Sequence, residues 1–109
     1  MNEKSNITMI YTTCPSLQVA ELIAGTLIKR RLAACVNIIP KIISIYSWDS
    51  KIKRDHEVAM LVKTKAKVSV EATAIIRELH TYDMPAIVTL SAEGGCETFL
   101  QWVQLQTGI

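Results

Sequence analysis

The chain has 109 residues, a mass of 12.1 kDa, a formal net charge of +2 and 50% hydrophobic residues, which fits one globular domain over residues 1–109. This composition excludes a disordered chain, and no run of about 20 apolar residues is present to span a membrane. The weak charge argues against a nucleic-acid partner. The apolar residues are mostly aliphatic, with 14 Ile and 8 Val against one Phe, two Trp and three Tyr. We expect contact between subunits to bury this aliphatic surplus.

The first half of the chain predicts a strand, a helix and a long hairpin. Residues 1–6 are polar, so we expect a flexible N-terminus without a secretory signal, and the β-rich run 7–12 predicts the first strand. Ser16 is a candidate N-cap for a helix with apolar residues at helical spacing over 19–28. Two β-rich segments, 34–48 and 52–64, flank a predicted turn at 49–51. Pro40 predicts a bulge or an edge, because proline cannot donate to a strand ladder.

The second half of the chain completes an α+β pattern. Helical periodicity over 68–79 predicts a second helix, and 86–90 predicts a short buried strand after a loop at 82–85. Phe99, Trp102 and Val103 predict a C-terminal helix. The order β-α-β-β-α-β-α predicts a ferredoxin-like split βαβ fold, in which both helices cover one face of an antiparallel sheet, with the last helix as an addition. Because this fold serves many functions, it decides none of them.

The predicted hairpin is apolar on both faces. Ile43 and Ile45 lie on one face of its first strand, and Tyr46 and Trp48 lie on the other. A monomer rarely exposes such a patch, so we expect these four residues to form an interface between identical chains. The alternative is a long hairpin that folds over its own domain.

The three cysteines predict free thiols. Cys14, Cys35 and Cys96 are odd in number and form no CxxC motif, as is typical of a reduced, cytoplasmic protein. Cys14 precedes the predicted first helix, where a helix N-terminus lowers a thiol pKa and favours an anion, and where the thiol offers a soft ligand for copper. Cys35 lies among apolar residues, so its side chain is expected to be buried. Cys96 follows two glycines, so its side chain is expected to be exposed.

Several motifs resemble the CutA (divalent-cation tolerance) family. They are RLAACVNIIP at 31–40, IISIYSW at 42–48, LVKT at 61–64 and HTY at 80–82, and the resemblance extends over about residues 7–103. It implies a ferredoxin-like protomer in a tight homotrimer, whose architecture is similar to that of PII signalling proteins, and a link to tolerance of copper and other divalent metals. Some bacterial members carry a metal-linked cysteine and paired histidines. The corresponding positions here are Thr12 and Leu79–His80, so the resemblance keeps only His80 as a metal ligand.

Four more polar positions are candidates for ligand binding. Glu57 and Lys63 share one face of the predicted second hairpin strand, and with Tyr82 and His80 they are expected to line clefts between protomers. Cys14, before the predicted first helix, is the fourth candidate. The alternative for Glu57 and Lys63 is a structural salt bridge to another subunit, and for His80 a helix-end hydrogen bond to a carbonyl.

The sequence thus predicts a cytoplasmic, non-enzymatic homotrimer that binds a divalent cation, most plausibly copper. The alternatives within the resemblance are a PII-like sensor of a small anionic ligand and a structural trimer that anchors partner proteins. An acylphosphatase-like hydrolase needs an arginine in a phosphate-binding loop after the first strand, and an RNA-recognition module needs aromatic residues on its central strands. The sequence has neither, so no catalytic residue and no nucleic-acid partner are expected.

Overall fold

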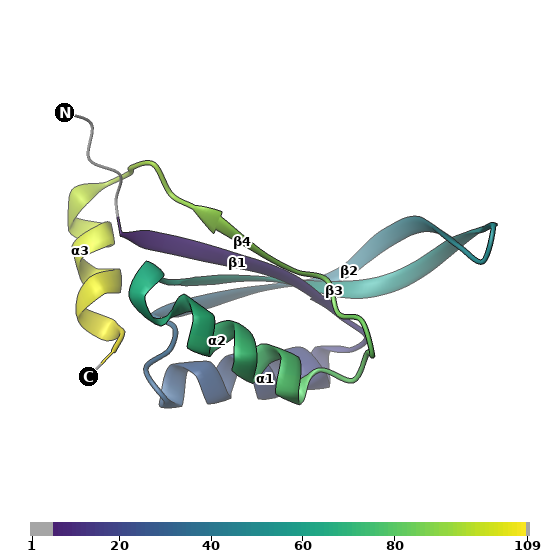
Figure 1. Ribbon diagram of the computed structural model, residues 1–109, viewed down its shortest axis with the longest axis horizontal. Helices are drawn as coiled ribbons and strands as arrows, with labels where there is room; N and C mark the ends of the chain where they lie inside the picture. The colour runs from purple at the N-terminus through teal and green to yellow at the C-terminus, as the bar shows by residue number, and fades with distance from the viewer. Residues whose placement is uncertain (1–5, 109) are drawn as a thin grey trace.

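The computed structural model describes residues 6–108, with principal extents of 47 × 31 × 21 Å (Figure 1). The elements in chain order are β1 (Ile7–Cys14), α1 (Leu17–Lys29), β2 (Cys35–Trp48), β3 (Lys51–Lys65), α2 (Ala66–Leu79), β4 (Ile87–Ser91) and α3 (Glu97–Gln106). The predicted order is confirmed. Of the predicted flexible N-terminus, residues 1–5 lie outside the described residues, and the carbonyl of Asn6 accepts a hydrogen bond from the amide of Ala66 at 2.7 Å.

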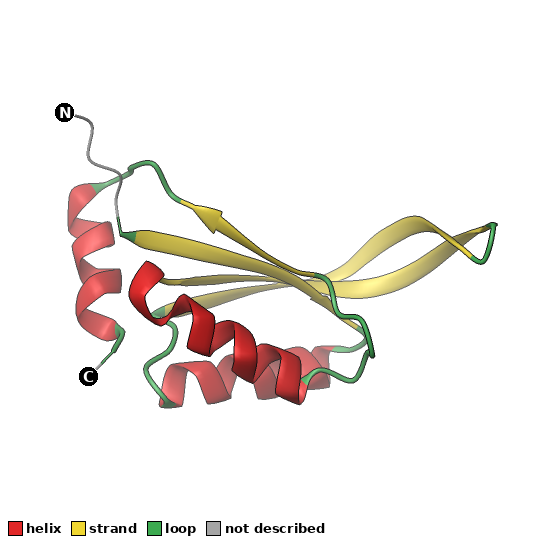
Figure 2. Ribbon diagram, in the orientation of Figure 1, coloured by secondary structure: helices red, strands yellow, loops and turns green. Residues whose placement is uncertain are grey.

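The four strands form one antiparallel sheet in the order β2-β3-β1-β4, which confirms the predicted split βαβ arrangement. Figure 2 shows α1 and α2 side by side on one face of the sheet, while α3 lies across the end of the sheet opposite the hairpin tip. Among residues 6–108, no helix covers the other broad face of the sheet. We call this face the open face.

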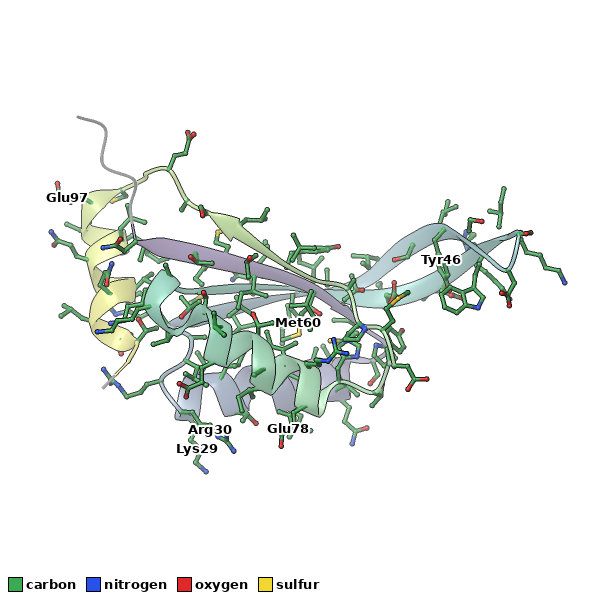
Figure 3. All side chains as sticks on the ribbon, viewed as in Figure 1. Lys29, Arg30, Tyr46, Met60, Glu78 and Glu97 are labelled. Carbon is green, nitrogen blue, oxygen red and sulfur yellow. The ribbon has the colours of Figure 1, made fainter. Side chains whose placement is uncertain are left out.

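The core lies between the sheet and the two long helices. Alternate residues of the central strands, among them Ile10, Met60 and Val62, point toward the helices and are fully buried. They pack against Ile23 of α1 and Ile76 of α2, and Figure 3 places Met60 in this layer. The Ser16 N-cap is confirmed, since its hydroxyl accepts a hydrogen bond from the amide of Val19 at 3.2 Å and satisfies one free donor of the first turn.

A bulge at Pro40 changes the register of the hairpin, as the sequence predicted. Ile39 lies opposite Ala59 and Ile42 lies opposite Glu57, so β2 holds one extra residue between these pairs. The backbone of Lys41 is left-handed, with φ of 62°. Odd-numbered residues of β2 therefore face the open side before the bulge, and even-numbered residues share a face with Glu57 beyond it.

The hairpin tip is a two-residue turn, shorter than the predicted 49–51. Asp49 and Ser50 have φ of 51° and 62°, the positive values that a type I′ hairpin turn requires at both central positions. The tip extends well beyond the helices (Figure 1), so both faces of the outer hairpin are uncovered.

One prediction of burial is wrong. The strand predicted as buried is the exposed edge strand β4, in which Val88 and Leu90 on the open face are 51% and 47% exposed. The apolar pattern of β4 is real, but within residues 6–108 nothing covers the side of the sheet toward which β4 presents these residues. The predicted C-terminal helix is confirmed as α3, in which Val103 is fully buried and Phe99 and Trp102 are more than 40% exposed.

Cationic side chains hold α3 against the body of the chain. The guanidinium of Arg31 donates to the carbonyls of Gly108 and Leu105 at 2.7 and 2.8 Å, and the Lys65 ammonium donates to the carbonyl of Gln104 at 3.4 Å. Positive charge at a helix C-terminus satisfies free carbonyls and opposes the helix dipole. Within residues 6–108, no helix is both long and apolar enough to cross a membrane.

Removing the hydroxyl from two core threonines should change stability differently from removing it from a third, hydrogen-bonded threonine. Thr12 and Thr64 are fully buried, and neither hydroxyl has a hydrogen-bond partner among the described residues. Thr12→Val or Thr64→Val should leave the free energy of unfolding unchanged or raise it by up to about 1 kcal/mol, because the hydroxyl is desolvated without compensation. The hydroxyl of buried Thr107 donates to the carbonyl of Val103 at 2.8 Å, so Thr107→Val is a matched control that should lose about 1 kcal/mol. Urea unfolding at one protein concentration measures all three. A larger loss for Thr12→Val than for Thr107→Val would contradict the assignment.

Candidate functional site

His80 ends α2, and both of its ring nitrogens have partners. Nε2 lies 2.6 Å from the carbonyl oxygen of Thr13, and Nδ1 accepts a hydrogen bond from the amide of Tyr82 at 3.1 Å. Because a carbonyl can only accept, this network assigns the hydrogen to Nε2 and makes the imidazole neutral. The carbonyl-bonded alternative from the sequence is the one that the structure shows, and the bond joins the end of α2 to the end of β1.

Tyr82 connects this histidine to the base of the hairpin. Its hydroxyl donates to Oε2 of Glu57 at 3.0 Å, and its ring centroid lies 4.8 Å from that of His80. Burial, and then the hydrogen bond to Glu57, raise the pKa of Tyr82 to about 12. His80, Tyr82 and Glu57 form what we call the hairpin-base cluster, drawn from α2, the loop after it and β3.

A second phenol–carboxylate pair lies next to this cluster. The hydroxyl of Tyr46 on β2 donates to the carboxylate of Asp55 on β3, and this hydrogen bond is the main cause that raises the pKa of Tyr46. Asp55 and Glu57 are two residues apart on β3, so both carboxylates lie on one face of the strand. Sequence reasoning did not identify the Asp55–Tyr46 pair, because its register depends on the bulge at Pro40.

Cys14 does not behave as its position before a helix predicted. Its thiol points into the core on the helix-covered side of β1, where Sγ donates to Sδ of Met60 at 3.4 Å. Burial, followed by the nearby charge of Glu57, raises its pKa to about 11, so the expected lowering is wrong. The prediction for Cys96 is confirmed: this thiol is exposed, and its contact with Thr98 lowers its pKa. Cys35 is only half-buried.

Lys63 lies apart from the other predicted ligand residues. It faces the same side of β3 as Glu57, but six residues along a strand correspond to about 20 Å. Its ammonium donates to Oδ1 of Asn37 and lies 5.9 Å from the ring centroid of Phe99. The structure therefore brings Glu57, Tyr82 and His80 together, places Cys14 behind the sheet, and places Lys63 at the far end of the open face.

The described chain contains no preformed metal centre. Among residues 6–108, no three His, Cys, Asp or Glu side chains are placed to hold one ion. His80 would have to give up a hydrogen bond before either nitrogen could bind a metal. One chain by itself thus does not fit a resident metal ion, and a metal role for His80 stays a prediction.

The four residues predicted at an interface are exposed in the single chain. Ile43 and Ile45 project from one face of the outer hairpin and Tyr46 and Trp48 from the other, with Ile45 the most exposed of the four at 69%. Figure 3 shows Tyr46 on the part of the hairpin that extends beyond the helices. The alternative in which the hairpin folds over its own domain does not occur.

The fold and this cluster define a class of small ferredoxin-like α+β proteins with a long projecting hairpin. A family model described as CutA1 divalent ion tolerance protein matches residues 8–106, and the chain belongs to this family. Protein CutA of Homo sapiens is 40% identical over 102 residues, which are 94% of this chain and 57% of the human protein. The chain thus spans little more than half the length of that relative.

Two microbial relatives match over nearly their whole length. The divalent-cation tolerance protein CutA of Thermus thermophilus is 39% identical over 100 residues, which are 92% of this chain and 97% of the relative. A solved structure from Archaeoglobus fulgidus, described as the periplasmic divalent cation tolerance protein CutA, superposes with a TM-score of 0.88 and 40% identity. It covers 92% of this chain and 97% of its own. Both relatives are named as tolerance proteins, and neither name describes an enzymatic reaction.

The three thiols should react at very different rates. The thiolate is the reactive form, so the exposed Cys96 should be alkylated first by iodoacetamide at pH 8, and Cys14 last, at least about a hundredfold more slowly. Mass spectrometry of peptides after timed alkylation measures the order. Cys96→Ser should remove the fast phase and leave the slow one unchanged. Early modification of Cys14 in the folded protein would contradict its placement in the core.

Tyr82 should titrate late and stabilise the fold below its titration. Its pKa in the folded chain, about 12, lies above the ordinary value of 10.0, so this contribution to stability is fully present below about pH 10. It is lost as the pH rises through about 12. In a spectrophotometric titration of the phenols, Tyr82→Phe should remove a late component. Glu57→Gln should shift that component toward lower pH, because the charged acceptor of the hydroxyl is gone. The pKa of Tyr46 is also raised, so the test concerns the component near pH 12: if that component is unchanged in Tyr82→Phe, the assignment is wrong.

Proposed function

We propose that this chain assembles as a homotrimer and takes part in the response to divalent metal ions without catalysing a reaction, binding a divalent cation, copper foremost. Membership of the divalent ion tolerance family supports the metal response. The exposed apolar hairpin and the open face of the sheet support the assembly. The observation that carries the proposal is the hairpin-base cluster, which holds a neutral imidazole and a carboxylate next to this apolar surface.

Tyr82 forms hydrogen bonds to both candidate metal ligands of the cluster, His80 and Glu57. The backbone amide of Tyr82 occupies Nδ1 of His80, and its hydroxyl occupies Oε2 of Glu57. A shift of Tyr82 alone would therefore release a nitrogen and an oxygen donor together. Imidazole nitrogen and carboxylate oxygen suit divalent transition metals. Water or another subunit would supply further ligands, because no three acidic, histidine or cysteine side chains in the described part of the chain are placed to hold one ion.

The arrangement of the nucleophilic residues supports a non-catalytic role. Catalysis by a cysteine requires a thiolate and a base within hydrogen-bond reach. Cys14 contacts Met60, its pKa is raised, and the His80 imidazole is bonded to backbone groups. A cytoplasmic location is also part of the proposal, supported by three cysteines that are free in the structure.

Metal titration tests the proposal most directly. Calorimetry of the intact protein with Cu(I), Cu(II) and Zn(II) should show saturable binding of at least one ion below about 100 μM, a standard free energy of about 5 kcal/mol. Glu57→Ala with His80→Ala should weaken that binding at least about tenfold. His56→Ala, an exposed histidine on the same strand, is the matched control and should leave the affinity unchanged. Unchanged affinity in the double variant, or no saturable binding of any ion, would overturn the metal role.

The two alternative functions give other outcomes. A PII-like sensor would bind a small anion such as inorganic phosphate and no metal, and it gains support from Lys63, whose ammonium contacts the neutral side chains of Asn37 and Phe99. A structural trimer that anchors partner proteins would bind neither probe in the calorimeter.

A further inference from the structure

We propose that the hairpin-base cluster is a composite site, completed by a second copy of this chain whose Lys63 forms an ion pair with Glu57. The inference rests on the homotrimer of the proposed function, and it adds the residue that each subunit contributes to the site of its neighbour. It makes the subunit contact head-to-tail, with the hairpin base of one chain against the α3 end of the next.

Lys63 has no ion-pair partner among the described residues of its own chain. Within residues 6–108, no carboxylate lies within salt-bridge distance of the Lys63 ammonium, which meets only the Asn37 amide oxygen and the Phe99 ring. Its neighbours on the open face are Met9 and Cys35 on the adjacent strands and Leu61 on its own strand, and none of these half-buried side chains carries a charge that could pair with it. A lysine on an apolar surface that becomes buried needs an anion, because an isolated buried charge is strongly unfavourable.

Glu57 likewise has no ion-pair partner among the described residues of its own chain. Glu57 is half-buried, and the structure gives its carboxylate one partner, the neutral hydroxyl of Tyr82. Asp55 differs, because Lys53 lies two residues away on the same face of its own strand, whereas Ala59 occupies the equivalent position beyond Glu57. Along β3, Glu57 therefore has no cation two residues away on its own face, whereas Asp55 has one.

The two charges cannot meet within one chain. They lie on the same rigid strand, about 20 Å apart. Between and beside them the open face carries exposed apolar side chains, among them Ile39, Val88 and Leu90. A contact that joins one end of this face to the opposite end of another copy is heterologous, and such contacts close into rings when the rotation permits. The charges then fix the direction of the ring and the apolar residues between them become buried.

A charge-swap experiment on the full-length protein tests the pair. Lys63→Glu and Glu57→Lys each place like charges at the contact, so each should weaken association at least about tenfold in sedimentation velocity across a concentration series. The double variant Lys63→Glu with Glu57→Lys restores opposite charges and should recover most of that loss. If Glu57 served only to accept the hydrogen bond from Tyr82, the double variant would not recover, because lysine at position 57 cannot accept that bond. Recovery therefore indicates an ion pair between subunits.

Matched controls lie on the helical side of the molecule. Lys29→Glu on α1 and Glu78→Lys on α2 reverse exposed charges on the outer surface of the helical layer (Figure 3) and should leave association unchanged. Lys63→Met keeps an apolar stem without adding repulsion, so it should weaken association less than Lys63→Glu. Circular dichroism of each variant separates loss of fold from loss of assembly.

The outcomes distinguish failure of the ion pair alone from failure of the proposed trimer. A wild-type trimer in which the double variant is no better than the single variants overturns the ion pair and leaves the trimer intact. Single variants that associate as strongly as the wild type would likewise overturn the ion pair and leave the trimer intact. A monomeric wild type overturns both the composite site and the assembly, whatever the metal titration shows.

Discussion

The two long helices of this chain cover the same face of its four-stranded sheet, and the other face and the projecting hairpin are apolar too. The core between the sheet and the helices is closed, with Ile10, Met60 and Val62 fully buried. The open face leaves Ile39, Val88 and Leu90 about half exposed, and the hairpin adds aromatic and aliphatic side chains beyond the edge of the helices. Association with further copies of the chain is the simplest way to remove this surface from water, because apolar burial is the main favourable term in assembly.

The bulge at Pro40 determines what this surface presents. One extra residue in β2 places Tyr46 on the same face as Asp55 and Glu57, and the loop after α2 adds Tyr82. The result is a polar cluster at the edge of an apolar face, in which each carboxylate accepts from a phenol and neither pairs with a described cation. Polar groups at the rim of an apolar patch give a contact its register and partner choice more than its strength.

Most of the fold followed from local patterns, whereas much of the site did not. Helix periodicity, the Ser16 cap and the Pro40 bulge depend on short-range chemistry, and the order of the strands follows from the split βαβ pattern of the elements along the chain. The structure confirms each of them. The strand at 86–90 was misassigned as buried, because an apolar run does not reveal that its face lacks a covering layer. The thiol pKa of Cys14 was predicted in the wrong direction, because its contact with Met60 joins residues 46 positions apart. The bond from His80 to the carbonyl of Thr13 spans 67 positions and depends on how α2 packs beside β1.

The central claim is that the open face and the hairpin are buried between copies of one chain. Native mass spectrometry of the purified protein at micromolar concentration tests it most directly. We expect a particle with three times the 12.1 kDa mass of one chain, with no appreciable monomer. A monomer as the main species at that concentration would contradict it, since the apolar surface would then be stable in water without a partner.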